Sequence, residues 1–199
     1  MTSTVFYGII IIRKQEGITD MVYMILADGF EEIEAIEPLD ILRRGGVDTK
    51  TASIMQTKSV RGAHGVEVCA DIMINEVDLD SMEMVILPGG AGHGLLDASN
   101  EVHAVINHAV AYNKFIAAIC ASPSILGKKM LLMGKKATCY PGFEEFCYDA
   151  EMTGEKAVRD GLIITGKGPG AAADFGFMLL ETLKDEKTAS TLKKDMQYE

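Results

Sequence analysis

The residue with the clearest chemical potential in this chain is a cysteine that follows a short apolar run. Phe115–Ile119 is typical of a buried strand, and Cys120 ends it just before Ser122-Pro123, where proline suits the first turn of a helix. A cysteine at such a strand-to-helix turn has its sulfur raised above the sheet edge, and the helix N-terminus favours thiolate over thiol. The alternative is a buried cysteine that acts only as a small apolar residue. The pattern therefore indicates Cys120 as a candidate nucleophile.

Three acidic residues could work with this thiol. Glu31, Glu32 and Glu34 begin a predicted helix over Glu31–Arg44, where acids also complement the helix dipole without any catalytic role. Glu31 and Glu34 share one helical face, so both could point toward the same sheet edge. A carboxyl group buried beside a thiolate would have a raised pKa and could move a proton. The spacing alone leaves the choice among the three open.

A glycine-rich turn follows another predicted strand. Pro88–Gly94 has the spacing G-x-G-x-G, which departs from the dinucleotide-binding fingerprint, and no acid ends a strand about 20 residues later. Exposed backbone amides that stabilise an oxyanion are a better interpretation. His93 is the only histidine expected near this edge. No histidines have metal-ligand spacing, and His64 is expected on the surface or in the core.

The elements that must position these residues alternate between strands and helices. Predicted strands cover Val22–Leu26, Val47–Ile54, Met84–Leu87, Phe115–Ile119, Lys136–Cys139 and Leu162–Thr165, and predicted helices cover Glu31–Arg44, Val102–Tyr112, Ala171–Leu183 and Lys184–Met196. Such alternation predicts an α/β fold with a mostly parallel sheet covered on both faces. Ligands of these folds bind beyond the carboxyl ends of the strands. The turns expected there are Ala27–Glu34, Pro88–Gly94, Cys120–Ser124 and Gly166–Gly170.

Composition excludes several classes of function. The 199 residues are 48% hydrophobic and 24% charged, with a net charge of −10, which disfavours nucleic acid as a partner. No apolar run reaches the roughly 18 residues of a membrane span. The four cysteines form no C-x-x-C pair, which favours a reducing cytoplasm and disfavours dithiol exchange. Cys69 and Cys139 are expected in the core or an interface. Cys147 is expected to pack against its neighbours and to have no catalytic role.

The first twenty residues require a separate interpretation. Val5–Ile12 has the length of a signal-peptide core, but no basic residue precedes it and no cleavage site follows. An added edge strand is the alternative. We expect residues 1–20 to be a non-essential extension and residues 21–199 to form a single domain.

Four segments in this order identify a family resemblance. They are Leu26–Glu34 (LADGFEEIE), Leu87–Gly90 (LPGG), Ala117–Pro123 (AAICASP) and Gly168–Gly170 (GPG). They resemble the ThiJ/PfpI superfamily and, within it, the branch of the parkinsonism-associated protein deglycase (the "DJ-one" proteins). The resemblance extends from about Met21 to the C-terminus. It implies a flavodoxin-like three-layer sandwich with a mostly parallel central sheet, a cysteine nucleophile elbow and a homodimer.

The resemblance also implies roles for individual residues. Cys120 would be the nucleophile and Glu34 the general acid/base. The backbone oxyanion hole would be formed by Gly89, Gly90 and Ala121, and the substrate pocket by Glu31, His93, Tyr140 and Pro169. Two departures disfavour a Cys–His mechanism, because Tyr140 and Ala121 stand where branches of the superfamily carry a histidine.

The implied function is glutathione-independent glyoxalase or deglycase chemistry in the cytoplasm. The enzyme would need no cofactor or metal and would act on methylglyoxal, glyoxal or their adducts through the Cys120 thiolate and a Glu34 proton shuttle. The alternative is a redox-sensing or chaperone protein of the oxidative-stress response, in which Cys120 is oxidised to a sulfinate. A cysteine peptidase and a nucleotide binder that uses the Gly90 and Gly168 loops are least favoured.

Overall fold

The computed structural model describes residues 20–198, so residues 1–19 of the expected extension lie outside it. Its central element is a seven-stranded sheet in the order β10-β11-β7-β6-β1-β2-β5. The strands are β1 (Met21–Leu26), β2 (Thr49–Ser53), β5 (Ile72–Met73), β6 (Met82–Leu87), β7 (Phe115–Ile119), β10 (Ala157–Asp160) and β11 (Ile163–Gly166). All neighbouring pairs are parallel except β10 with β11. This confirms the mostly parallel sheet.

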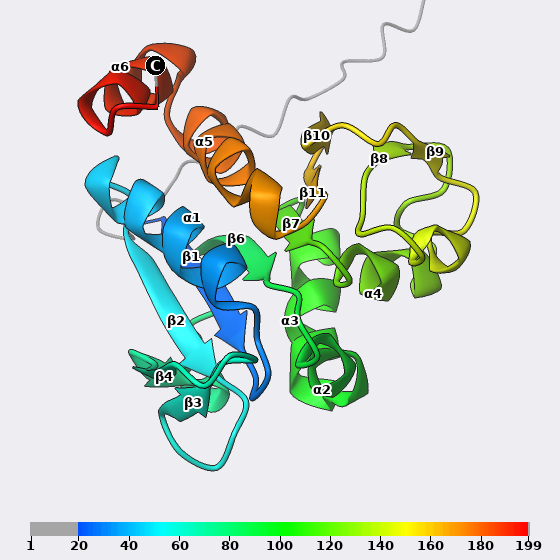
Figure 1. Ribbon diagram of the computed structural model, residues 1–199. Coiled ribbons are helices and arrows are strands. Elements are labelled where there is room, and N and C mark those ends of the chain that lie inside the picture. The colour runs from blue at the N-terminus through cyan, green and yellow to red at the C-terminus, as the bar shows by residue number, and fades with distance from the viewer. Residues whose placement is uncertain (1–19, 199) are drawn as a thin grey trace, which may run out of the picture.

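Helices cover both faces of this sheet (Figure 1). One face packs against α1 (Glu32–Arg44) and α5 (Ala172–Leu183), and α6 (Glu186–Asp195) packs beside α5. The other face packs against α3 (Asn100–Ala111) and α4 (Pro123–Lys128), with α2 (His93–Ala98) preceding α3. Alternate residues of β1 enter the two cores, since Met24 faces α1 and Ile25 faces α3. The three-layer α/β sandwich is therefore confirmed.

Several short elements lie outside the main sheet. They are the hairpin of β3 (Ser59–Arg61) and β4 (Glu67–Cys69), the pair of β8 (Lys136–Ala137) and β9 (Glu151–Met152), and the 3-10 turns η1 (Ile74–Glu76), η2 (Glu144–Phe146) and η3 (Pro169–Ala171). The strand expected over Lys136–Cys139 is thus shorter and belongs to a separate two-stranded sheet. Cys69 is exposed and not in the core, because its two-stranded ribbon leaves one side open to solvent. Within the described residues, no helix has the length and apolar character needed to cross a bilayer.

One close approach fixes the segment after β8 against α4. A Cβ atom added at Gly127 would lie 2.1 Å from the carbonyl oxygen of Phe146 and 2.6 Å from Cα of Cys147. These are backbone atoms, so they cannot move aside by rotation of a side chain. Gly127 is therefore required for the contact between α4 and η2.

Gly127→Ala should lower the free energy of unfolding by about 2 kcal/mol or more, because the added methyl group forces the η2 backbone away from α4. Gly94→Ala in α2 is the matched control, since nothing lies within 4 Å of a Cβ atom there. That control should leave stability unchanged or raise it by up to about 1 kcal/mol. Urea unfolding of the two variants measures the difference, and equal stabilities would contradict the packing argument.

Candidate active site

Cys120 stands at the sharp turn between β7 and α4. Its φ is 67°, in the left-handed region that costs a non-glycine residue roughly 1–2 kcal/mol. The backbone N–H donates to Gly166 O at 2.9 Å, and the carbonyl accepts from the Tyr140 N–H at 2.8 Å. These hydrogen bonds hold the strained residue from both sides. The expected nucleophile elbow is therefore present, with Cys120 8% exposed.

Glu34 lies beside this thiol, in the first turn of α1. It is 0% exposed, and its Oε2 accepts a hydrogen bond of 2.9 Å from the Gly89 N–H. Its Oε1 is also buried and makes no hydrogen bond of normal geometry within residues 20–198. A Cβ atom added at Gly89 would lie 2.5 Å from Glu34 Oε2 and 2.6 Å from Cys120 Cβ, so Gly89 lies against both groups and leaves no room for a side chain. Of the three candidate acids, Glu34 is the one in contact with Cys120.

Burial controls the protonation of this pair. It raises the pKa of Glu34 from 4.5 to about 7, against the opposing effect of hydrogen bonds with Cys120 and Gly89. Burial, followed by the negative charge of Glu34, raises the pKa of Cys120 to about 12. The expectation that the helix N-terminus favours the thiolate is therefore wrong while Glu34 is ionised. The two acids compete for one negative charge, and protonation of Glu34 removes the main charge that opposes a thiolate.

The backbone amides near the sulfur divide into two groups. Hydrogen bonds from the Gly90 and Ala121 N–H groups lower the pKa of Cys120, which places these amides at the thiol. The Gly89 N–H is already used by Glu34, so Gly89 positions the carboxyl group and does not offer the expected free oxyanion amide. Gly90 has φ of 83°, which favours glycine. His93 Nδ1 lies 2.9 Å from Gly90 O, so this side chain helps to hold the turn at Gly90 in place.

Tyr140 and Pro169 border a shallow depression beside the pair. The depression has a volume of about 210 Å³, and Tyr140, Pro141, Lys156, Lys167 and Pro169 are among its lining residues. A Cβ atom at Gly168 would lie 3.0 Å from the Tyr140 ring and 4.0 Å from Glu34 Oε1, so this glycine connects the depression to the carboxyl group. The two lysines were not expected. Lys167 lies within the turn Gly166–Gly170, which the sequence places at the ligand-binding edge, but no sequence pattern indicates that Lys156 lies there.

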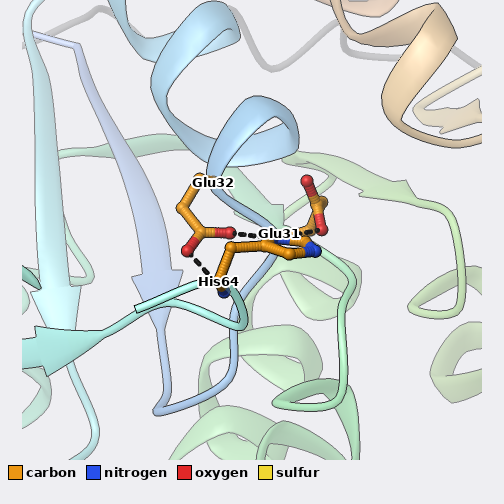
Figure 2. A group of neighbouring side chains, drawn as sticks. All are labelled: Glu31, Glu32 and His64. Carbon is orange, nitrogen blue, oxygen red and sulfur yellow. Dashed lines mark hydrogen bonds and ion pairs between the residues drawn. The ribbon is translucent and has the colours of Figure 1, made fainter. Parts of the chain in front are cut away.

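A second group of ionisable side chains lies at the start of α1. His64 Nδ1 is 2.8 Å from Glu32 Oε2 and 3.5 Å from Glu31 Oε2 (Figure 2). The His64 backbone N–H also donates to Glu32 Oε1 at 2.7 Å. The hydrogen bond to Glu32 and the nearby charges raise the pKa of His64. The cluster therefore ties the β3–β4 loop to α1 beside the active site.

This cluster also has donors of the type that a divalent cation takes. Ligand atoms of Glu31, Glu32 and His64 lie within 4.8 Å of one another, and no other such group occurs in the described part of the chain. Both oxygens of Glu32 already interact with His64, which accounts for the geometry without an ion. Sequence spacing could not reveal the group, because 32 positions separate Glu32 from His64.

Comparisons with known proteins show the family and the fold of this chain. The model of the DJ-1/PfpI family matches residues 20–182. Protein DJ-1 homolog B of Arabidopsis thaliana is 34% identical over 174 residues, 86% of this chain, although the chain spans only 40% of that relative. The glutathione-independent glyoxalase DJR-1.2 of Caenorhabditis elegans is 31% identical over 166 residues, 82% of this chain and 88% of the relative.

Two further matches are an archaeal protein and a solved structure. Deglycase TK1284 of Thermococcus kodakarensis is 30% identical over 151 residues, 75% of this chain and 90% of the relative. The structure of oxidised Toxoplasma gondii DJ-1 matches with a TM-score of 0.84 and 35% identity, and the match covers 90% of this chain and 98% of that one.

The raised pKa of Glu34 predicts a specific dependence of stability on pH. The folded state holds the proton up to about pH 7, whereas the unfolded state releases it near 4.5, so stability falls as pH rises through this window. The loss amounts to about 3 kcal/mol. Glu34→Gln cannot ionise and should not show this loss.

Urea unfolding at intervals between about pH 4 and 8 measures this effect. The stability of Glu34→Gln relative to wild type should increase with pH across the window, while the exposed Glu145→Gln control should follow the wild-type curve. If the free energies of unfolding of wild type and Glu34→Gln changed in parallel with pH, the pKa of Glu34 in the folded protein would not be raised.

Proposed function

The chain belongs to the DJ-1/PfpI family, and on this premise we propose that it is a cofactor-free enzyme of glyoxalase and deglycase type. Its substrates would be methylglyoxal, glyoxal or their adducts. The observation that carries the proposal is the contact between the buried Cys120 thiol and the buried Glu34 carboxyl group. The names of the relatives in Caenorhabditis elegans and Thermococcus kodakarensis support this class of reaction.

The first step joins the thiol to the aldehyde carbon. Cys120 Sγ forms a bond to this carbon while its proton passes to the Glu34 carboxylate, and the carbonyl oxygen becomes an alkoxide. With a pKa of about 7, Glu34 can both take and return a proton near neutral pH. The Gly90 and Ala121 N–H groups would stabilise the alkoxide, which then takes the proton back from Glu34 to give a hemithioacetal and leaves Glu34 ionised for the next step.

The second step moves a proton between adjacent carbons. Glu34 removes the C–H proton of the hemithioacetal carbon, and the resulting enediol is reprotonated at the neighbouring carbon to give a thioester of Cys120. Water then cleaves the thioester, which frees the thiol and releases lactate from methylglyoxal or glycolate from glyoxal. No redox cofactor is required, because one carbon is oxidised as its neighbour is reduced.

The same addition chemistry extends to adducts. Methylglyoxal bound to an amine as an aminocarbinol could transfer its carbon to Cys120 as the amine leaves, which is deglycation. The depression beside Tyr140 offers room for the carrier of such an adduct. Pro169 and Glu31 would border the substrate. His93 would not touch the substrate and would only hold the Gly90 backbone in position.

The proposed enzyme also has an expected location, oligomeric state and functional domain. We infer a cytoplasmic protein, because the sequence shows no disulfide framework. We also infer a homodimer, supported by Ile33 and Ile36 on α1, which are 50% and 37% exposed. Nucleic acid is disfavoured as a partner by the net charge of −10. Residues 21–199 would be the functional domain, and residues 1–20 would be dispensable.

Purified wild type should consume methylglyoxal, and Cys120→Ser should lower kcat/KM by at least about 100-fold because the nucleophile is lost. Glu34→Gln should lower kcat about 100- to 10,000-fold through loss of proton transfer. Cys69→Ser, which changes an exposed thiol on β4, is the control with full activity. Full activity of Cys120→Ser would exclude the mechanism.

A second candidate function, redox sensing, rests on the buried Glu34 carboxyl group beside Cys120. If protonated, this group could donate a hydrogen bond to a cysteine sulfinate and favour that oxidation state. Two equivalents of hydrogen peroxide would supply the two oxygen atoms and leave as water.

Mass spectrometry after mild peroxide treatment should then show two added oxygens on Cys120, and fewer in Glu34→Ala. The extent of oxidation of the exposed Cys69 in the same sample measures the non-specific oxidation of thiols. Stable Cys120 sulfinate in a protein without dicarbonyl turnover would favour sensing, whereas equal oxidation of Cys120 and Cys69 would remove this candidate.

A further inference from the structure

A buried hydroxyl group lies two residues after Cys120, at the start of α4. Ser122 is 0% exposed, and its Oγ donates a hydrogen bond of 2.6 Å to Pro88 O. Serine at the N-cap position of a helix usually accepts a hydrogen bond from the first turn, but Ser122 makes no such bond to α4. Its hydroxyl instead joins the turn after β7 to the turn after β6.

The carbonyl group that accepts this bond belongs to the same peptide unit as the amide that binds Glu34. Pro88 supplies the C=O of this unit, and Gly89 supplies the N–H, which donates to Glu34 Oε2 at 2.9 Å. In a trans peptide these two groups lie in one plane and point in opposite directions. The unit therefore connects the Ser122 hydroxyl on one side with the Glu34 carboxyl group on the other.

The next peptide unit of this turn is anchored by the backbone. Gly89 O accepts a hydrogen bond of 3.0 Å from the Glu31 N–H, a donor that is present whatever the side chain of that residue. The buried Pro88 carbonyl differs, because its donor is the side chain of Ser122. The position of the Gly89 amide thus depends on a hydroxyl group that a substitution can remove.

Two hydrogen bonds that share one peptide unit strengthen each other. Donation to the Pro88 carbonyl polarises the unit and makes the Gly89 N–H a stronger donor. A stronger donor favours the ionised form of the Glu34 carboxyl group, which opposes the effect of burial on its pKa. The Ser122 hydroxyl therefore acts on Glu34 through the peptide between them.

We propose that Ser122 is a positioning residue of the catalytic pair, whose hydroxyl holds the Pro88–Gly89 peptide so that the Gly89 N–H supports the ionised Glu34 carboxyl group. In the proposed reaction this is the form of Glu34 that accepts the Cys120 proton. The part of Ser122 in turnover rests on the proposed function, whereas its effect on the Glu34 proton does not.

Ionisable groups also act on Glu34 directly. Besides burial, a hydrogen bond with Cys120 lowers the pKa of Glu34, and the negative charge of Glu31 raises it. The Tyr140 ring lies on the other side of Gly168 from the carboxyl group. Removal of the Ser122 hydroxyl keeps all these groups, so a change in the titration of Glu34 would report on the shared peptide.

Infrared difference spectra of the full-length protein test this role through the buried carboxyl band. In Ser122→Ala the band should disappear about half a pH unit higher than in wild type, because the Gly89 N–H becomes a weaker donor to the carboxylate. Ser124→Ala is the matched control. Ser124 is 1% exposed, and its Oγ also donates at 2.6 Å, but to Ala121 O within its own turn. This control should keep the wild-type midpoint.

The pH dependence of kcat/KM gives a second readout. Its rise with pH should move upward by the same interval in Ser122→Ala, since Glu34 must be ionised to accept the Cys120 proton. A serine that only stabilised the fold would lower the unfolding temperature without moving either midpoint. An unchanged Glu34 midpoint in folded Ser122→Ala would overturn the proposal, and so would an equal shift in Ser124→Ala.

NMR of wild type with isotope-labelled serine decides the proposal if Ser122→Ala does not fold. The Ser122 Cβ signal should titrate with the midpoint of the Glu34 band, whereas the Ser124 signal should not. A Ser122 signal that does not respond to pH would overturn the proposal.

The two proposals fail in different ways. If the Glu34 midpoint moves in Ser122→Ala while wild type consumes no dicarbonyl, the effect of Ser122 on Glu34 stands and the proposed enzyme function fails. If wild type consumes methylglyoxal but the midpoint does not move, the enzyme function stands and the role of Ser122 fails.

Discussion

The structure depends on one constraint, namely that a carboxyl group and a thiol are buried in contact with each other. Three neighbouring strands of the sheet bring this about. The end of β1 leads into α1 and Glu34, the end of β6 supplies Gly89, and the end of β7 supplies Cys120. Because β1, β6 and β7 are parallel neighbours, their carboxyl ends meet at one edge. Only glycine fits between the two side chains, since any Cβ atom there would collide with both.

Burial also explains the chemistry that this edge can perform. A carboxyl group in solution would be ionised at neutral pH, but removal from water raises the pKa of Glu34 to about 7. The same burial disfavours a second negative charge on Cys120, so near neutral pH the pair carries at most one negative charge and can exchange one proton. The strained elbow and the amides of Gly90 and Ala121 then direct where a substrate oxygen would lie. Proton transfer between these two groups is therefore the chemistry that this edge offers.

Much of the fold followed from the sequence, because buried strands and amphipathic helices leave strong local patterns. The sharp turn at Cys120 could also be predicted from neighbouring residues alone. The choice of Glu34 was not, since helical spacing left three acids open and only the resemblance, and then burial, separated them. Contacts between distant segments left no signal in the sequence; these are the contact of His64 with Glu32 and the position of Lys156 beside Tyr140. The use of the Gly89 amide by Glu34 likewise depends on packing that a turn motif does not encode.

The central claim is that burial beside Cys120 keeps the Glu34 carboxyl group protonated below about pH 7. Infrared difference spectroscopy of the protonated carboxyl band, recorded as pH rises from about 5 to 9, observes this proton without an activity assay. The account predicts a buried carboxyl band that disappears near pH 7 in wild type and is absent from Glu34→Gln. A wild-type protein whose spectrum matches that of Glu34→Gln throughout, with no buried carboxyl band at pH 5, would contradict it.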